Sequence, residues 1–164
     1  MENKLYFYKA HESAIIPSKR KEDAGYDLYA LQTDEVLIIR PGETLMINTG
    51  IRTAFSSNYV MLARERGSTG TIGMKVGAGV IDSGYRGTIF IPINNTGNKR
   101  IIITPKCEEV TEVDDMIYYP KSKGICQVLM VPVQHLEVKE LTEDEYNSLE
   151  KTERQEGALG SSGK

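Results

Sequence analysis

Short runs of strand-forming residues recur along most of this 164-residue chain, and this pattern restricts its fold more than any other feature. The runs are rich in Val, Ile, Tyr and Thr, and turn residues such as Pro41-Gly42 separate them. No long helical period lies between them, which favours an all-β fold: a distorted antiparallel β-barrel or jelly-roll-like sandwich. The expected strands are residues 5–9, 27–31, 36–40, 44–51, 59–64, 88–93, 100–104 and 126–133.

One late segment, residues 141–151, is expected to be a short helix. Thr142 and Glu145 have the spacing of a capping box, in which each side chain bonds to the backbone of the other residue. No fixed-period repeat is present. The sequence therefore allows one short helix in an otherwise β-rich chain.

Two other segments interrupt the strand pattern. Residues 104–120 hold five acids against one lysine, and we expect them to form an acidic insert outside the regular strands. Residues 157–164 are rich in Gly and Ser, and residues 154–164 are expected to be a flexible C-terminal arm. The expected organisation is a single β domain over residues 1–153 followed by this arm.

Charge and hydropathy exclude several classes of protein. The net charge of −3 argues against direct nucleic-acid binding, which needs a basic excess. No apolar run is long enough for a membrane span, and the N-terminus does not resemble a signal peptide. Cys107 and Cys126 are too far apart for a CxxC site and are expected to be reduced. We expect a cytoplasmic protein without membrane contact.

Asp82 lies in the stretch GAGVIDSGYRG, residues 77–87, and three interpretations are open for it. Asp-Ser-Gly is common in β-turns, where Asp bonds its own backbone. Two hydrophobic residues before Asp-Ser-Gly also suit an aspartic protease that shares its site across a homodimer, although Tyr85 is large for that loop. The third interpretation is a base that activates water beside an aromatic ring.

Three further stretches are candidates for anion or metal binding. RERGSTGTIG, residues 64–73, is either a polar loop or a cradle in which Arg and backbone amides bind phosphate. Asp27 is either a solvated strand-edge carboxylate or a contact to the water shell of Mg²⁺. Arg154 with GALGSSGK is either a frayed terminus or a lid that becomes ordered over an anion.

Five stretches, in this order, resemble the five motifs of the trimeric dUTPases, the deoxyuridine triphosphate nucleotidohydrolases. AGYDL at 24–28 resembles the first, RGS at 66–68 the second, GVIDSGYRG at 79–87 the third, GICQV at 124–128 the fourth and RQEGALGSSG at 154–163 the fifth. Each motif is short, but five in the family's order form a specific pattern.

The resemblance implies hydrolysis of dUTP to dUMP and pyrophosphate with Mg²⁺ as cofactor. Asp82 would deprotonate the attacking water, the backbone around Gly79 would read the uracil edge, and Tyr85 would lie on the sugar. Asp27 would reach Mg²⁺ through a water. The implied phosphate contacts are Arg66, Ser68 and Gln127 for the α and β groups, and Arg154, Ser161 and Ser162 for the γ group.

The chain departs from the usual family pattern at two positions. The family has Ser directly after the motif-two Arg, whereas this chain has Gly67 and then Ser68, so both are candidates for that contact. Leu159 stands where the family usually has Phe, which stacks on uracil. Stacking of an aromatic ring on a base contributes about 1 to 3 kcal/mol, so closure of the arm is expected to be weaker here.

The resemblance also implies a homotrimer, with the third motif of one subunit facing the first, second and fourth motifs of a neighbour. The acidic insert is a candidate surface for a protein partner. Two other functions compete: a dCTP deaminase of the same fold, which would need a glutamate base near the pyrimidine, and a regulatory protein-binding module that uses the insert. We expect removal of the insert to spare dUTP turnover.

Overall fold

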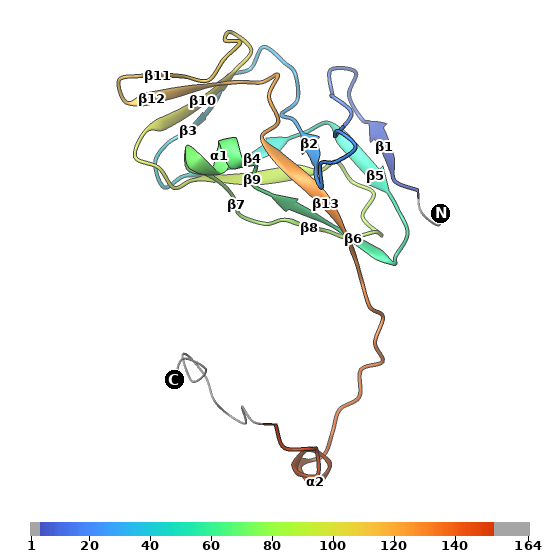
Figure 1. Ribbon diagram of the computed structural model, residues 1–164. Coiled ribbons are helices and arrows are strands. Elements are labelled where there is room, and N and C mark those ends of the chain that lie inside the picture. The colour runs from blue at the N-terminus through green and yellow to red at the C-terminus, as the bar shows by residue number, and fades with distance from the viewer. Residues whose placement is uncertain (1–3, 153–164) are drawn as a thin grey trace. The chain divides into compact units, whose positions relative to one another are not determined.

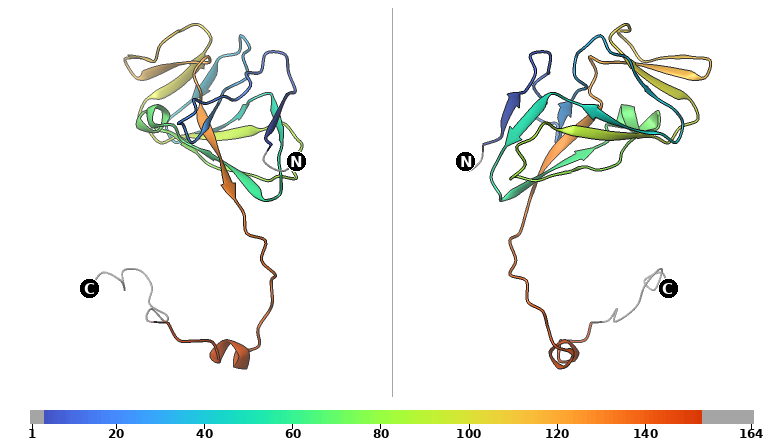
Figure 2. Two further views of the ribbon diagram at one scale, coloured as in Figure 1. Left: turned by 45° about the vertical axis from the view of Figure 1, so that its right-hand side comes forward. Right: turned by 180° about the vertical axis from the view of Figure 1, so that it is seen from behind.

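The computed structural model describes residues 4–152, which form thirteen strands and two short helices (Figures 1 and 2). This composition confirms the all-β prediction. In chain order the elements are β1 (Tyr6–Lys9), β2 (Tyr26–Leu28), β3 (Leu37–Ile39), β4 (Thr44–Asn48), β5 (Ile51–Ala54), β6 (Tyr59–Arg64), α1 (Gly67–Thr71), β7 (Met74–Val76), β8 (Val80–Ile81), β9 (Phe90–Asn95), β10 (Arg100–Thr104), β11 (Thr111–Val113), β12 (Met116–Pro120), β13 (Cys126–Pro132) and α2 (Glu143–Asn147).

The strands form four small sheets. Their orders are β1-β5, β11-β12-β10-β3, β2-β13-β6-β8 and β4-β9-β7. Within the described residues the hydrogen-bonded ladder does not close into a barrel, and all pairs are antiparallel except β10 with β12. In Figures 1 and 2 the sheet that contains β10 and the β1-β5 pair lie toward opposite ends of the strand-rich unit. The jelly-roll-like expectation holds, with one parallel pair added.

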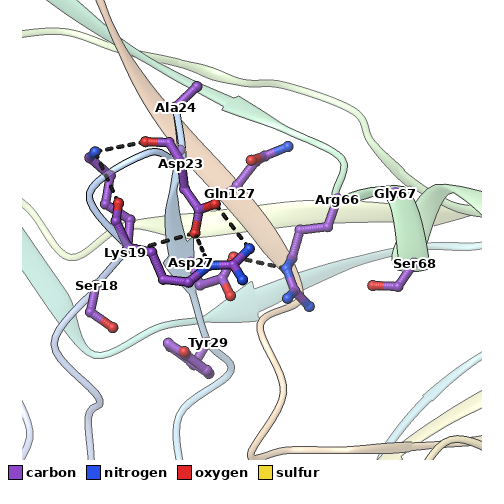
Figure 3. Close-up of a pocket in the computed structure, with 12 residues that line it drawn as sticks. Ser18, Lys19, Asp23, Ala24, Asp27, Tyr29, Arg66, Gly67, Ser68 and Gln127 are labelled. Atoms are coloured by element: carbon purple, nitrogen blue, oxygen red, sulfur yellow. Dashed lines mark hydrogen bonds and ion pairs between the residues drawn. The ribbon is translucent and has the colours of Figure 1, made fainter.

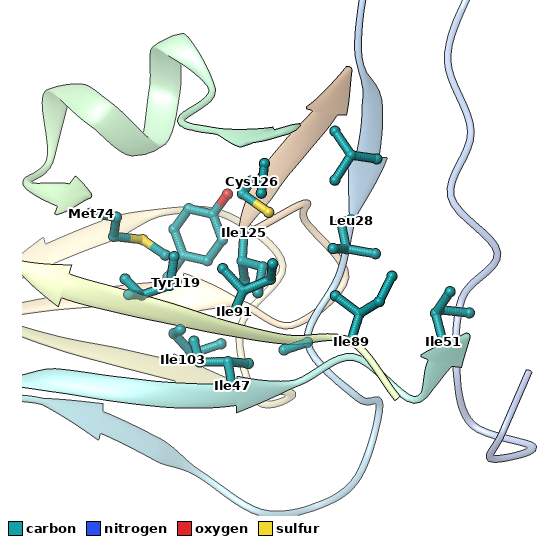
Figure 4. Close-up of a cluster of buried hydrophobic side chains, with 14 of the residues drawn as sticks. Leu28, Ile47, Ile51, Met74, Ile89, Ile91, Ile103, Tyr119, Ile125 and Cys126 are labelled. Atoms are coloured by element: carbon teal, nitrogen blue, oxygen red, sulfur yellow. The ribbon is translucent and has the colours of Figure 1, made fainter. Parts of the chain in front are cut away.

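The core follows the period-two alternation that strands impose. In β10, Ile101 and Ile103 are fully buried while Ile102 between them is partly exposed, and in β4 Ile47 is buried while Met46 is exposed. Figure 4 shows the central cluster, to which strands from several sheets contribute. Its labelled members are Leu28, Ile47, Ile51, Met74, Ile89, Ile91, Ile103, Tyr119, Ile125 and Cys126.

The acidic segment 104–120 is more closely tied to the sheet than the sequence suggests. Its second half forms β11 and β12, and β12 pairs along its length with β10. Ile117 and Tyr119 of β12 belong to the core cluster. The expectation of an insert outside the strands is therefore wrong for this half, because the alternating MIYYP sequence supplies core side chains. The deletion of the whole segment would remove those side chains, so we no longer expect it to spare turnover.

One expected strand is divided in two. The sequence predicts a single strand over residues 44–51, whereas in the structure β4 ends at Asn48 and β5 begins at Ile51. Gly50 has a φ of 66°, in the left-handed region that favours glycine, and its amide donates to Asn48 Oδ1 at 2.8 Å. The expected strand is therefore interrupted at a glycine, while residues on both sides of it, Thr49 and Ile51, bond to the backbone of Ile89.

The two helices are short. Helix α2 falls inside the expected segment 141–151 and has the capping box of Thr142 and Glu145. It belongs to a separate unit that begins at His135. Helix α1 was not expected; it begins after Arg66, whose amide donates to Thr69 Oγ1 at 3.0 Å. No helix of the described chain is long and apolar enough to span a membrane.

Candidate functional site

A polar pocket lies where β2 and β13 run side by side and the chain leaves β6 for α1 (Figure 3). It encloses about 630 Å³. The sequence-predicted residues Asp27, Arg66, Gly67, Ser68 and Gln127 all line it, although they come from three separate motifs. We call this surface the polar pocket.

An ion pair between Asp27 and Arg66 organises the polar pocket. Arg66 Nε lies 2.8 Å from Asp27 Oδ1, and the two side chains are 28% and 30% exposed. A second guanidinium nitrogen, Nη1, donates to the Gly124 carbonyl at 3.2 Å. These contacts fix the plane of the guanidinium and leave further N–H groups of its fork for a ligand. A partly shielded, doubly held arginine is well suited to bind a phosphate oxygen.

Gln127 is positioned by its neighbours on both sides. It pairs with Asp27 across β2 and with Arg64 across β6, and its Nε2 donates to the Glu65 carbonyl at 2.9 Å. A Cβ on Gly25 would lie 2.4 Å from Gln127 Oε1, so only glycine leaves room for this side chain. The motif-one glycine thus makes space for the motif-four glutamine.

Helix α1 presents the serine and glycine of the second motif. Thr69 is fully buried and its hydroxyl accepts from the Arg66 amide, which anchors the turn. Gly67 and Ser68 are exposed at the pocket. A Cβ on Gly67 would meet nothing within 4 Å, so there is room in the fold for a side chain at either position.

Glu65, which the sequence analysis did not select, supports the same turn. Its carboxylate accepts from the Val76 amide at 3.1 Å. Backbone hydrogen bonds, first from its own amide and then from Val76, lower the pKa of Glu65 against the opposing effect of burial. The carboxylate therefore connects the chain before α1 to β7.

Several other lining residues were also missed. Lys19, Arg20 and Asp23 form a charged turn before β2, in which Arg20 Nε lies 2.9 Å from Asp23 Oδ2. Lys19 Nζ donates to the Asp23 carbonyl at 2.7 Å and lies 5.4 Å from the centre of the Tyr26 ring. The charge run KRKED directly before AGYDL was the available signal.

Asp82 and Tyr85 line a different pocket, of about 740 Å³ and with mostly apolar neighbours. We call it the hairpin pocket. Asp82 is exposed, and its carbonyl accepts from the Tyr85 amide at 3.1 Å, as in an ordinary turn. Tyr85 OH donates to the Thr88 carbonyl at 2.9 Å, and its ring lies where a Cβ on Gly87 would be. The hairpin thus folds its tyrosine back over its own second glycine.

Strand β8, which leads into Asp82, is an edge strand. It pairs with β6 on one side only, and its residues Val80 and Ile81 line the hairpin pocket. The unpaired edge of such a strand offers main-chain donors and acceptors. Gly79 lies at the start of β8, and its carbonyl accepts from the Ala63 amide at 2.7 Å.

Gly79→Ala is expected to lower both stability and activity. A Cβ at this position would lie 2.4 Å from the Ala63 carbonyl oxygen, so β8 would have to move away from β6. Overpacking of this kind costs about 1 to 3 kcal/mol. Thermal unfolding and steady-state kinetics measure the two effects.

Gly84→Ala is the matched control in the same hairpin, because a Cβ there would meet nothing within 4 Å. It should unfold at nearly the wild-type temperature. Equal effects of the two substitutions would contradict the importance of the β8–β6 contact.

Within the described residues of one chain, the motifs of the expected site lie in two separate pockets. The polar pocket holds the first, second and fourth motifs, and the hairpin pocket holds the third, with no lining residue in common. Arg154, Leu159, Ser161 and Ser162 lie outside the described residues. Within the described part, no group of three or more His, Cys, Asp or Glu side chains is arranged to hold a metal ion.

Known proteins are similar to this chain in both sequence and fold. A model of the dUTPase family matches residues 11–107. Deoxyuridine 5'-triphosphate nucleotidohydrolases from Hydrogenobaculum and Nautilia profundicola are 32% and 33% identical, each over 98% of this chain and at least 98% of the relative. The structure of a Staphylococcus bacteriophage 80alpha dUTPase mutant with dUpNHpp has a TM-score of 0.75 and 26% identity, and covers 98% of both chains.

Proposed function

The chain belongs to the dUTPase family and is a dUTP diphosphatase, and we propose that each active site joins the hairpin pocket of one subunit to the polar pocket of another. The observation that carries the proposal is the separation of Asp82 from Arg66 into pockets with no lining residue in common. A site that needs both groups is completed when a second copy brings its polar pocket to the hairpin. The dCTP deaminase and binding-module alternatives are not favoured by the relatives.

Base recognition is assigned to the free edge of β8. Uracil has an N3 donor between two carbonyl acceptors, and the backbone of Gly79, Val80 and Ile81 carries complementary groups. Support comes from the position of β8 at the end of its sheet and from its place in the hairpin pocket. Cytosine reverses two of these groups, and each unpaired buried polar group costs about 1 to 3 kcal/mol. Tyr85 would pack on the deoxyribose, where a 2′-hydroxyl would collide with it.

The chemical step is assigned to Asp82 as general base for water attack on the α-phosphorus. The carboxylate is exposed at the hairpin pocket and fixed at the tip of a short strand, so that it can reach a water beside the bound nucleotide. Arg66, Ser68 and Gln127 of the other subunit would hold the α and β phosphates. Positioning and charge stabilisation of this kind supply most of the catalysis in phosphoryl transfer.

The residues of the polar pocket fit a Mg²⁺ ion that is held mostly by phosphates and water. Asp27 gives one oxygen to Arg66 and is 30% exposed, so its other oxygen can accept from a metal-bound water. Mg²⁺ usually keeps several waters and takes only one or two carboxylates in such sites. When bound, it would neutralise charge on the phosphates.

A homotrimer with three such sites is part of the proposal. Met46, Val80 and Phe90 are large apolar side chains that line the hairpin pocket and are exposed in the single chain. An exposed apolar patch of this kind suits contact with another subunit. The arm at 154–164, with Arg154, Ser161, Ser162 and Leu159, is proposed to close over the γ-phosphate and the base.

Two further proposals concern a protein partner and the location of the protein. Strand β11 is the edge of its sheet and all three of its residues are exposed, which suits strand pairing with a protein partner at the acidic segment. Cys107 and Cys126 are free thiols, as in proteins of a reducing compartment, which supports a cytoplasmic location.

Pyrophosphate release from dUTP, dCTP, dTTP and UTP, measured side by side with and without Mg²⁺, tests the proposed function. We expect dUTP to be preferred by roughly four orders of magnitude in kcat/KM over dCTP, as for sites built on hydrogen bonds. A chelator should abolish turnover. Comparable rates for dUTP and dCTP would contradict base recognition by β8.

A further inference from the structure

Tyr119 makes a contact that core packing alone does not require. It lies in β12 and is only 1% exposed, within the core cluster beside Met74 and Ile125 (Figure 4). Its hydroxyl donates to the Gly124 carbonyl at 2.7 Å. The same carbonyl accepts from Arg66 Nη1 at 3.2 Å. One oxygen therefore uses both lone pairs to connect a core tyrosine with the arginine of the polar pocket.

The backbone at Gly124 passes very close to the ion pair that it supports. A Cβ on Gly124 would lie 3.2 Å from Asp27 Cβ and Cγ, and 3.3 Å from Arg66 Cδ. Small changes in the direction of this peptide would therefore move the Arg66 side chain. Gly124 lies in the loop between β12 and β13, two strands of different sheets, so the Tyr119 hydroxyl ties this loop back to β12.

We propose that Tyr119 is a positioning residue for Arg66, acting through the Gly124 carbonyl to hold the guanidinium at the angle that phosphate binding needs. This inference rests on the proposed role of Arg66 in binding the α and β phosphates. Tyr119 does not line the polar pocket itself, although it lines a smaller neighbouring cavity with Asp27, Arg66 and Ser68. Burial raises the pKa of Tyr119, against the opposing charge of Arg66, so the hydroxyl stays a hydrogen-bond donor near neutral pH.

The test is a double-mutant cycle with Tyr119→Phe, Arg66→Ala and the double variant. Loss of one hydrogen bond to an oriented group should lower kcat/KM for dUTP by roughly tenfold in Tyr119→Phe. If Tyr119 acts through Arg66, the same substitution should have almost no further effect once Arg66 is alanine. An equal loss in both backgrounds would overturn the inference, and so would wild-type kcat/KM in Tyr119→Phe.

A binding ratio separates positioning from a general loss of stability. The affinities for a non-hydrolysable dUTP analogue and for deoxyuridine, which has no phosphates, are both measured on folded protein. The ratio of the first affinity to the second then reports the phosphate contacts alone. Tyr119→Phe should lower this ratio by roughly tenfold. Ile117→Val, a second core change in β12, should lower the melting temperature and leave the ratio unchanged. A ratio unchanged by Tyr119→Phe would count against positioning.

The cycle also distinguishes the two proposals from each other. If Arg66→Ala retains wild-type kcat/KM, the phosphate role of Arg66 fails, and the inference fails with it. If Arg66→Ala is strongly impaired but Tyr119→Phe acts independently of it, only the inference fails.

Discussion

Asp82→Asn is expected to reduce kcat for dUTP by about 10²- to 10⁴-fold, the usual contribution of a general base. The substitution keeps the size of the side chain but removes its capacity to take a proton from water. Asp82 is exposed at the hairpin pocket and makes its turn contact to Tyr85 through its backbone carbonyl, so folding should be unaffected. Single-turnover pyrophosphate release measures the chemical step, and calorimetry with a non-hydrolysable dUTP analogue measures binding.

Asp114→Asn is the matched control for this prediction. Asp114 lies in the turn between β11 and β12 with a φ of 54°, a conformation that Asn also accepts. The control should keep wild-type kinetics. Near-normal turnover in Asp82→Asn would remove Asp82 from the role of base and return the β-turn interpretation to first place.

Arg66→Ala is the second substitution with a large expected effect, a loss of about 10²- to 10³-fold in kcat/KM. Truncation of one partner in a shielded, hydrogen-bonded charge pair costs about 2 to 5 kcal/mol. The change removes the phosphate contact and also leaves Asp27 without its partner at 2.8 Å. We expect affinity for the analogue to fall along with turnover, unlike in Asp82→Asn. Steady-state kinetics and analogue titration distinguish the two patterns.

Two further variants make the Arg66 result specific. Arg100→Ala removes an arginine that pairs with Asp115 on an exposed surface, at 3.1 Å, and should have little effect. Arg66→Lys keeps the charge but loses the planar fork that holds Asp27 and Gly124 together, and should recover only part of the activity. Full activity in Arg66→Lys would show that charge alone is sufficient.

The sequence predicts the fold well where strands are long and alternate. Strands β4, β6, β9, β10 and β13 lie within or close to the expected runs, because a half-buried strand needs apolar residues at every second position. Strands β7 and β8 have three and two residues and stand among glycines, so periodicity gives no signal there. They form because β9 and β6 already provide edges to pair with.

The acidic segment shows how charge can hide a strand. Five acids in residues 104–120 suggest a solvated excursion, and the residues of β11 are indeed exposed. The following MIYYP places Ile117 and Tyr119 in the core by pairing with β10. A parallel pairing of this kind depends on tertiary contacts and cannot be read from local composition.

The sequence predicts the candidate site mainly through the resemblance of its motifs to those of the family, and less through the chemistry of individual residues. The residues alone left Asp82 as a turn, a protease group or a water-activating base, and left Arg66 in a polar loop or an anion cradle. The structure brings Asp27, Arg66 and Gln127 together through the neighbouring strands β2 and β13. The role of Tyr119 had no signal in the sequence, because a tyrosine in a strand is usually core, and its hydroxyl contact depends on the fold.

Mixed trimers of Asp82→Asn and Arg66→Ala test the central claim most directly. The two variants carry different tags, are co-expressed and are purified through both tags, so that every trimer contains both kinds of subunit. If each site combines Asp82 of one subunit with Arg66 of the next, about one site in three is intact in every mixed trimer. The account predicts close to a third of wild-type pyrophosphate release. Activity no higher than that of the two separate variants would contradict a site shared between subunits.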